Sequence, residues 1–251
     1  CGDGAALGLQ PFDAVPDHHC RFVDPAKRVV RRGTHVIGLV SYLVFFAIVA
    51  SILAIAVLGL NLQWGNTGLF NGGVAAFFGA GAYGTLILGG GPQDGQLGGF
   101  GLFYPLALLG GMATAGLLAW GVGILTLRLR HDYLAISTFG IAVAFENLMR
   151  NAQWLGGGAQ GLRGFDRPLR AALGDGFLYN ILFLLCVLVL LVLTYRFLET
   201  LVASPFGRQL RAIREDETAA RSLGKVPTRI RLTAFVTGCV ILGLAGGLYG
   251  T

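Results

Sequence analysis

Long apolar runs alternate with short polar or glycine-rich segments along most of the chain. A helix that crosses a bilayer needs about 20 mostly apolar residues. The run 177–197 is the strongest, and 132–149 is the weakest because it carries Asp132 and Glu146. The expected spans are 36–60, 68–88, 100–127, 132–149, 177–197 and 231–249. The pattern predicts an all-α fold, a polytopic transmembrane helical bundle of about six spans, with further spans expected after Thr251.

Charge along the chain predicts its domains and orientation. We expect an extramembrane N-terminal segment at 1–35 and a transmembrane domain at 36–251. Cytoplasmic loops collect Lys and Arg, and the linker 198–230 is the most charged stretch. This linker is therefore assigned to the cytoplasm. Counting back one span at a time places loop 151–176 and residues 1–35 on the outer side.

The N-terminal segment leaves two questions open. Lys27, Arg28, Arg31 and Arg32 precede the first span, where the positive-inside rule favours the cytoplasm. A re-entrant segment at 68–88 would reverse the parity and restore agreement. The first residue is Cys1, which suggests either a removed leader followed by lipidation or an arbitrary boundary of the chain. On the outer side, Cys1 and Cys20 are candidates for a disulfide.

Composition supports a membrane protein and excludes several other classes. Hydrophobic residues make up 54% of the 251 residues and charged residues 13%, about half of the roughly 25% charged share of soluble domains. This argues against disorder, a coiled coil, collagen or an ordinary soluble enzyme. The net charge of +6 fits membrane topology better than nucleic-acid binding. The four cysteines lack metal-ligand spacing, and Cys186 and Cys239 are expected to be inert.

Polar residues at the start of the second expected span are the first candidates for function. Asn66 and Thr67 stand just before this span, and Asn71 lies in its glycine-rich first residues. A broken helix at this depth must be buried in protein or line a cavity, and it can direct free N–H groups at a substrate. These residues are therefore candidates for lining a substrate pathway. The alternative is close helix packing, with Gly68 and Gly72 at a spacing of four.

The fourth expected span contributes Thr138 and Glu146 to the same candidate pathway. An intramembrane ionisable residue is costly and marks a functional candidate. Glu146 also precedes Arg150 by four residues, the favourable order for a structural ion pair. Both interpretations of Glu146 stay open. The glycine-rich segment 154–164 is either a partner-binding loop or a plain connection.

The most specific segment is 204–224, within the coupling segment 203–228. Leu210 and Ile213 give a short helix an apolar side, while arginines occupy the other. Such a helix either lies on anionic lipid or docks in a groove of a cytoplasmic partner. The sequence contains no P-loop, H-E-x-x-H or G-x-S-x-G motif. We therefore expect no catalytic residues, no metal and no cofactor in this chain.

Four blocks of sequence resemble the membrane subunits of bacterial ABC importers for branched-chain and other hydrophobic amino acids. The resemblance covers about residues 40–251, and its last block is the most specific. Residues 61–65, Asn-Leu-Gln-Trp-Gly, are nearest to the neutral amino-acid branch. The blocks are 56–68 continuing into 75–83, 127–140, 155–162, and 204–224 continuing into 244–250.

The resemblance implies a mechanism and partners. A second permease subunit, in a homo- or heterodimer, would complete the path through the bacterial inner membrane. Two cytoplasmic ATPase subunits would hold ATP and Mg, and a periplasmic binding protein would deliver the substrate. Membrane lipid would surround the subunit, and no nucleic acid is involved. The segment 204–224 matches the family's coupling region, so ATPase contact is expected at Arg208, Arg211, Arg214, Glu215 and Asp216.

Three positions depart from the family pattern. Members commonly have a histidine where Val74 stands, and many have Glu at Val143 and Arg at Glu146. These differences leave open a relative that carries a urea- or amide-like solute. The alternative function is a secondary transporter or channel for a small polar solute, independent of an ATPase. An ion-coupled version would depend on Glu146, the sole intramembrane candidate that the sequence offers.

Overall fold

A computed structural model describes residues 25–91, 98–127, 131–158, 161, 177–222, 224 and 226–251, with backbone alone for 25–37, 131, 132, 156 and 219. The chain divides into two compact units, residues 1–40 and 41–251. The proposed Cys1–Cys20 disulfide lies outside the described residues. So do most of the outer loop 151–176 and most of the segment 1–35.

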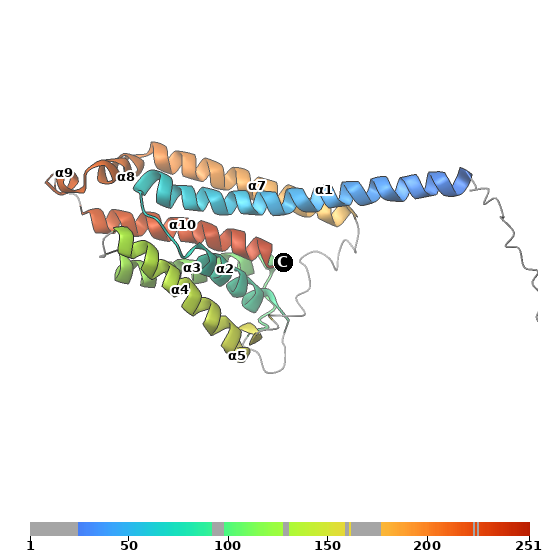
Figure 1. The fold of residues 1–251 in the computed structure, drawn as a ribbon, viewed down its shortest axis with the longest axis horizontal. Helices are drawn as coiled ribbons and strands as arrows, with labels where there is room; N and C mark the ends of the chain where they lie inside the picture. Colours follow the sequence, from blue (N-terminus) through green and yellow to red (C-terminus); the bar gives the residue numbers. More distant parts are fainter. Residues whose placement is uncertain are drawn as a thin grey trace, which may run out of the picture. The chain divides into compact units, whose positions relative to one another are not determined.

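Secondary structure in the described residues is helical (Figure 1). Helices α3, α8 and α10 each carry proline in their first turn, where the missing N–H costs no hydrogen bond. The elements in order are α1 (Pro25–Asn61), the π-helical turn η1 (Leu62–Asn66), α2 (Val74–Gly89), α3 (Tyr104–Thr126), α4 (His131–Asn151), α5 (Gln153–Gly156), α7 (Phe177–Ala203), α8 (Pro205–Glu215), α9 (Glu217–Ser222) and α10 (Pro227–Tyr249).

The predicted polytopic helical bundle is confirmed, with a difference in its spans. Four helical segments of the described chain are long and apolar enough to cross a membrane: Gly38–Asn66, Tyr104–Thr126, Phe177–Ala203 and Pro227–Tyr249. The expected span 68–88 is instead the 16-residue helix α2, because residues 68–73 are not helical. Helix α4 has 21 residues but is too polar to join the four. Helix α2 is shorter, and helix α4 more polar, than the four segments that could cross a membrane.

Helix α10 lies at the centre of the second unit. One apolar cluster joins it to α1 and α7 through Ile52, Val187 and Ala245. A second cluster joins its other side to α2, α3 and α4, with Phe77 and Phe235 in edge-to-face contact at 5.5 Å. Figure 1 shows α10, in red, between these two groups of helices. The candidate residues at the ends of α1 and α2 therefore face a fixed central helix.

Glycines set the spacing between α2, α3 and α10. A Cβ atom at Gly81 would overlap the backbone of Gly243, and one at Gly246 would overlap the carbonyl oxygen of Phe78. Small residues let helix backbones approach closely in membranes. The glycine-rich sequence of α2 is thus explained for the most part by packing against its neighbours.

Candidate functional site

The chain breaks its helical course between α1 and α2. The π-helical turn η1 ends at Asn66, and Gly68 follows with a φ of +70°, a conformation that glycine adopts without steric cost. The side-chain amide of Asn66 donates to the carbonyl of Asn61 at 3.4 Å. Helix α2 then begins only at Val74. This break places several polar side chains against α4 and α10.

Gln63 is the centre of a buried polar network at this break. Its side chain is fully buried, and its amide nitrogen donates to the carbonyl of Phe235 at 2.9 Å and contacts the Cys239 sulfur at 3.1 Å. Its amide oxygen accepts from the Asn71 amide at 3.0 Å. The Asn71 oxygen accepts the N–H of Gly73 at 2.9 Å. The network therefore joins η1, the start of α2 and α10.

Three of the predicted pathway residues meet around this network. Thr67 is buried, and its hydroxyl donates to the carbonyl of Gln63. Thr138 is buried on α4, where its hydroxyl accepts the N–H of Gly72 at 3.0 Å. Asn71 belongs to the network itself. All three are held by hydrogen bonds within the protein, and a role in lining the pathway stays a prediction for them and for the half-buried Asn66.

The sequence did not predict the contact between Gln63 and Cys239. They are 176 positions apart, so no local spacing joins them. The available signal was a glutamine inside an apolar run, because a buried amide needs hydrogen-bond partners. Cys239, expected to be inert in the core or facing lipid, is fully buried.

Replacing Gln63 by Leu is expected to destabilise the protein by about 1 to 3 kcal/mol, because the Phe235 carbonyl and the Asn71 amide lose buried partners. The unfolding temperature of the purified protein in detergent measures the effect. A thiol-reactive fluorophore serves as reporter in a protein whose Cys1, Cys20 and Cys186 are replaced by Ser, since the buried Cys239 becomes accessible on unfolding. The same exchange at the exposed Gln153 is the control. Equal stability of both variants would contradict the network's structural role.

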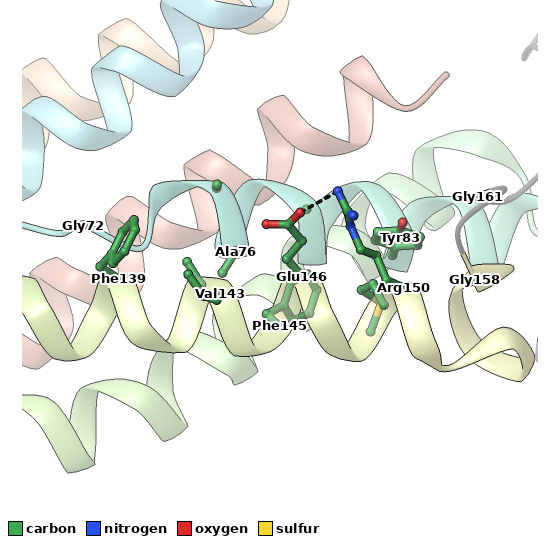
Figure 2. A pocket seen from close by; sticks show the side chains of 14 residues that line it. Gly72, Ala76, Tyr83, Phe139, Val143, Phe145, Glu146, Arg150, Gly158 and Gly161 are labelled. Atoms are coloured by element: carbon green, nitrogen blue, oxygen red, sulfur yellow. Dashed lines mark ion pairs between the residues drawn. The ribbon is translucent and has the colours of Figure 1, made fainter.

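Glu146 lies apart from the network, beside a cavity between α2 and α4 (Figure 2). The cavity has a volume of about 750 Å³. Its walls are mainly apolar, with glycines and alanines from α2 and Phe139, Val143 and Phe145 from α4. Glu146 and Arg150 form an ion pair at 2.9 Å on its edge, and both side chains are more than half exposed. The structure therefore confirms the predicted pair and also gives Glu146 a place in a cavity wall.

Helix α8 presents its arginines outward and anchors itself through its apolar side. Leu210 and Ile213 are buried, whereas Arg208 and Arg211 are exposed. The guanidinium of Arg214 donates a hydrogen bond to the carbonyl of Gly65 in η1. This contact joins α8 to the break between α1 and α2. The sequence could not predict it, because the two residues are 149 positions apart.

The acidic residues at the end of α8 and directly after it divide into two roles. Glu215 and Asp216 are exposed, and the Asp216 carboxylate accepts the N–H of Thr218 at 2.8 Å, at the start of α9. Glu217, which the sequence analysis did not select, pairs with Arg221 at 2.6 Å and with Arg231 at 2.8 Å. Arg231 is largely buried at the start of α10. Glu217 thus fastens the short helix α9 to the central helix.

The Glu217 ion pairs make this attachment sensitive to acid. Partial burial raises the pKa of Glu217, but the charge of Arg231 and the hydrogen bonds from Arg221 and Arg231 outweigh burial and hold this pKa below its ordinary value. A carboxyl with a lowered pKa in the folded state stabilises the fold above its unfolded pKa. That contribution is lost as the pH falls through the folded pKa.

Replacing Glu217 by Gln is therefore expected to cost about 1 to 3 kcal/mol at pH 7, because Arg231 loses a charged partner. The difference from the unsubstituted protein should shrink as the pH is lowered from about 6 to about 3. Unfolding temperatures across this range measure it. Gln at the exposed neighbour Glu215 is the matched control. A pH-independent difference would contradict the assignment.

Comparison with known proteins identifies a family that matches this chain. The family model described as the branched-chain amino acid transport system permease component matches residues 42–251. The matched region holds the network at Gln63, the cavity between α2 and α4, and helices α8 and α9.

Individual relatives agree with the family match. The chain is 36% identical to the high-affinity branched-chain amino acid transport system permease protein LivM of Salmonella typhimurium, over 76% of this chain and 48% of that protein. The LivM protein of Escherichia coli K12 gives the same values. A probable LivM of Methanocaldococcus jannaschii is 32% identical over 49% of this chain and 34% of its own length. The chain thus spans about half the length of the first two relatives. No solved structure matches the chain.

Proposed function

Because the chain belongs to the family of permease components of branched-chain amino acid transport systems, we propose that it is a permease subunit of an ATP-driven importer. The proposed substrates are branched-chain or other neutral and hydrophobic amino acids. The family match and four candidate spans support a multi-pass membrane protein. The proposed location is the bacterial inner membrane.

The proposal assigns the energy and the delivery of substrate to partners. Two ATPase subunits bind and hydrolyse ATP on the cytoplasmic side, and a periplasmic protein delivers the amino acid. A second permease subunit completes the path. In this orientation the linker 198–230 is cytoplasmic, loop 151–176 is periplasmic and the segment 1–35 is periplasmic.

The outward-facing arginines of α8 carry the coupling part of this proposal. Leu210 and Ile213 already bury the apolar side of the helix against its own chain, so insertion of that side into lipid is disfavoured. Arg208 and Arg211 remain exposed for an acidic surface on a partner. The hydrogen bond from Arg214 to Gly65 gives a motion of α8 a direct route to η1. We assign ATPase contact to Arg208, Arg211, Arg214, Glu215 and Asp216.

The break between α1 and α2 is the proposed gate of the substrate path. Asn66 lies at its edge, and Thr67, Asn71 and Thr138 fix its backbone through hydrogen bonds. Backbone that leaves the helix at membrane depth is tolerated where it is buried in protein or lines a cavity. A shift of η1 would exchange these internal bonds for bonds to a passing polar group.

Purification of the protein from its native membrane in mild detergent tests the proposal. We expect an ATPase subunit, identified by mass spectrometry, to accompany the protein, together with a second permease. A protein that arrives alone and moves solute into liposomes without ATP would overturn the proposal. It would favour a secondary transporter or channel instead, with Glu146 as the next residue to substitute.

A further inference from the structure

The cavity between α2 and α4 combines apolar walls with one pair of opposite charges. Its volume of about 750 Å³ lies within the range of roughly 300 to 1,000 Å³ typical of small-molecule sites. Such sites are mostly apolar, with a few polar groups that orient the ligand. Here Phe139, Val143 and Ala76 supply apolar surface, while Glu146 and Arg150 supply the polar groups.

The ion pair has the charge pattern of a receptor for a zwitterion. The Glu146 carboxylate and the Arg150 guanidinium lie 2.9 Å apart and are both largely exposed. Their outer atoms thus remain accessible to a ligand. A free amino acid carries its ammonium and its carboxylate on the same α-carbon. These can meet Glu146 and Arg150 respectively, with charge-assisted hydrogen bonds at each contact.

The floor of the cavity is kept open by small residues of α2. Ala75, Ala76 and Gly79 line it, with Gly72 just before the helix, and a Cβ atom at Gly79 would lie 3.2 Å from the ring of Phe145. The small side chains leave room that larger ones would fill. An aliphatic side chain can therefore lie along α2 while its charged end meets the ion pair.

The position of the pair also indicates a role beyond that of a surface ion pair that only stabilises the fold. An exposed i,i+4 pair contributes only about 0.3 to 0.5 kcal/mol to a fold, so stability alone explains little of it. In a membrane bundle, ionisable groups usually face a protein interior or a water-filled cavity. Helix α4 is also outside the set of helices apolar enough to span a bilayer by themselves. Its charged edge thus suits a substrate path better than lipid.

We propose that Glu146 and Arg150 bind the ammonium and carboxylate of a neutral amino acid, whose aliphatic side chain occupies the cavity between α2 and α4. This inference rests on the proposed function and names a substrate subsite within it. The mainly apolar wall favours leucine-like side chains over charged ones, because a second charge would be desolvated there without a partner.

The test is protection of a cysteine from labelling in membranes that hold the complete transport complex. Val143→Cys places a thiol in the cavity wall, and mass spectrometry of the peptide with residue 143 reports the rate of maleimide labelling. Leucine is compared with leucinamide, which lacks the carboxylate, and with 4-methylpentanoate, which lacks the ammonium. Uptake of labelled leucine with and without ATP is measured in parallel.

We expect leucine at millimolar concentration to slow labelling several-fold and both analogues to protect far less. Adding Glu146→Gln or Arg150→Gln should remove the protection by leucine. The control is Glu199→Gln, which breaks another exposed ion pair, with Arg196 at 3.6 Å on α7, and should leave protection unchanged.

Two outcomes overturn the inference and are distinguishable from failure of the proposed function. Leucine uptake that needs ATP, without any protection at residue 143, removes the subsite but keeps the importer. Equal protection by leucine and both analogues also removes it, because recognition would then ignore the charges. Zwitterion-specific protection without ATP-dependent uptake would support the subsite and reject the importer.

Discussion

Reversing the charges of Arg208 and Arg211 together is expected to release the ATPase subunit and to abolish ATP-dependent transport. Both guanidinium groups are exposed on α8, whereas the neighbouring Leu210 and Ile213 hold the helix in place. Breaking a buried charge pair at an interface costs about 2 to 5 kcal/mol. Two such losses, if additive, would weaken the complex by at least about a thousandfold. The amount of ATPase that copurifies with the variant measures the effect.

The control for this experiment must change charge without touching α8. Arg229 is exposed in the same charged linker, on the first turn of α10, and Arg229→Glu should retain the ATPase. Arg208 and Arg211 make no contact that the described structure needs for folding, so the double variant should unfold at an unchanged temperature. Full retention of ATPase by this variant would place the coupling surface elsewhere.

Gly81→Val is expected to destabilise the protein by about 4 kcal/mol or more, the range reached when a core position is overpacked without room to relax. A Cβ atom at Gly81 would overlap the backbone of Gly243, and neither α2 nor α10 can move without losing contacts to α3. Because the overlapping atoms of Gly243 belong to the backbone, no change of side-chain rotamer can relieve the overlap. The yield of folded protein and its unfolding temperature measure the effect.

Gly121→Val provides the matched comparison for that substitution. Gly121 lies within α3, yet a Cβ atom there would have no neighbour within 4 Å. Both substitutions place the same β-branched residue in a helix, so the difference between them isolates packing. Similar losses at both positions would contradict the close contact of α2 with α10.

The apolar pattern predicted much of this fold because length and hydropathy act locally. The helices α7 and α10 and the amphipathic helix α8 lie where the sequence indicated. The span expected at 68–88 was wrong at its start. A sequence shows that glycines are present but not that the backbone at Gly68 turns to a positive φ, which depends on the helices around it.

The sequence predicted several of the polar residues of the candidate site but not the residues to which they form hydrogen bonds. Thr138 and Asn71 could be selected because polar residues are rare in apolar segments of the sequence. Their partners could not, since Gln63 reaches Phe235 across 172 positions and Arg214 reaches Gly65 across 149. Such contacts follow from helix packing, which no short spacing in the sequence encodes.

The most direct test of the central claim is leucine uptake by liposomes that contain the complete complex purified from its native membrane. The account predicts uptake against a gradient that requires hydrolysable ATP and disappears in the Arg208→Glu, Arg211→Glu double variant. Leucine uptake that proceeds equally without ATP, or an intact complex that hydrolyses ATP and moves no amino acid, would contradict it.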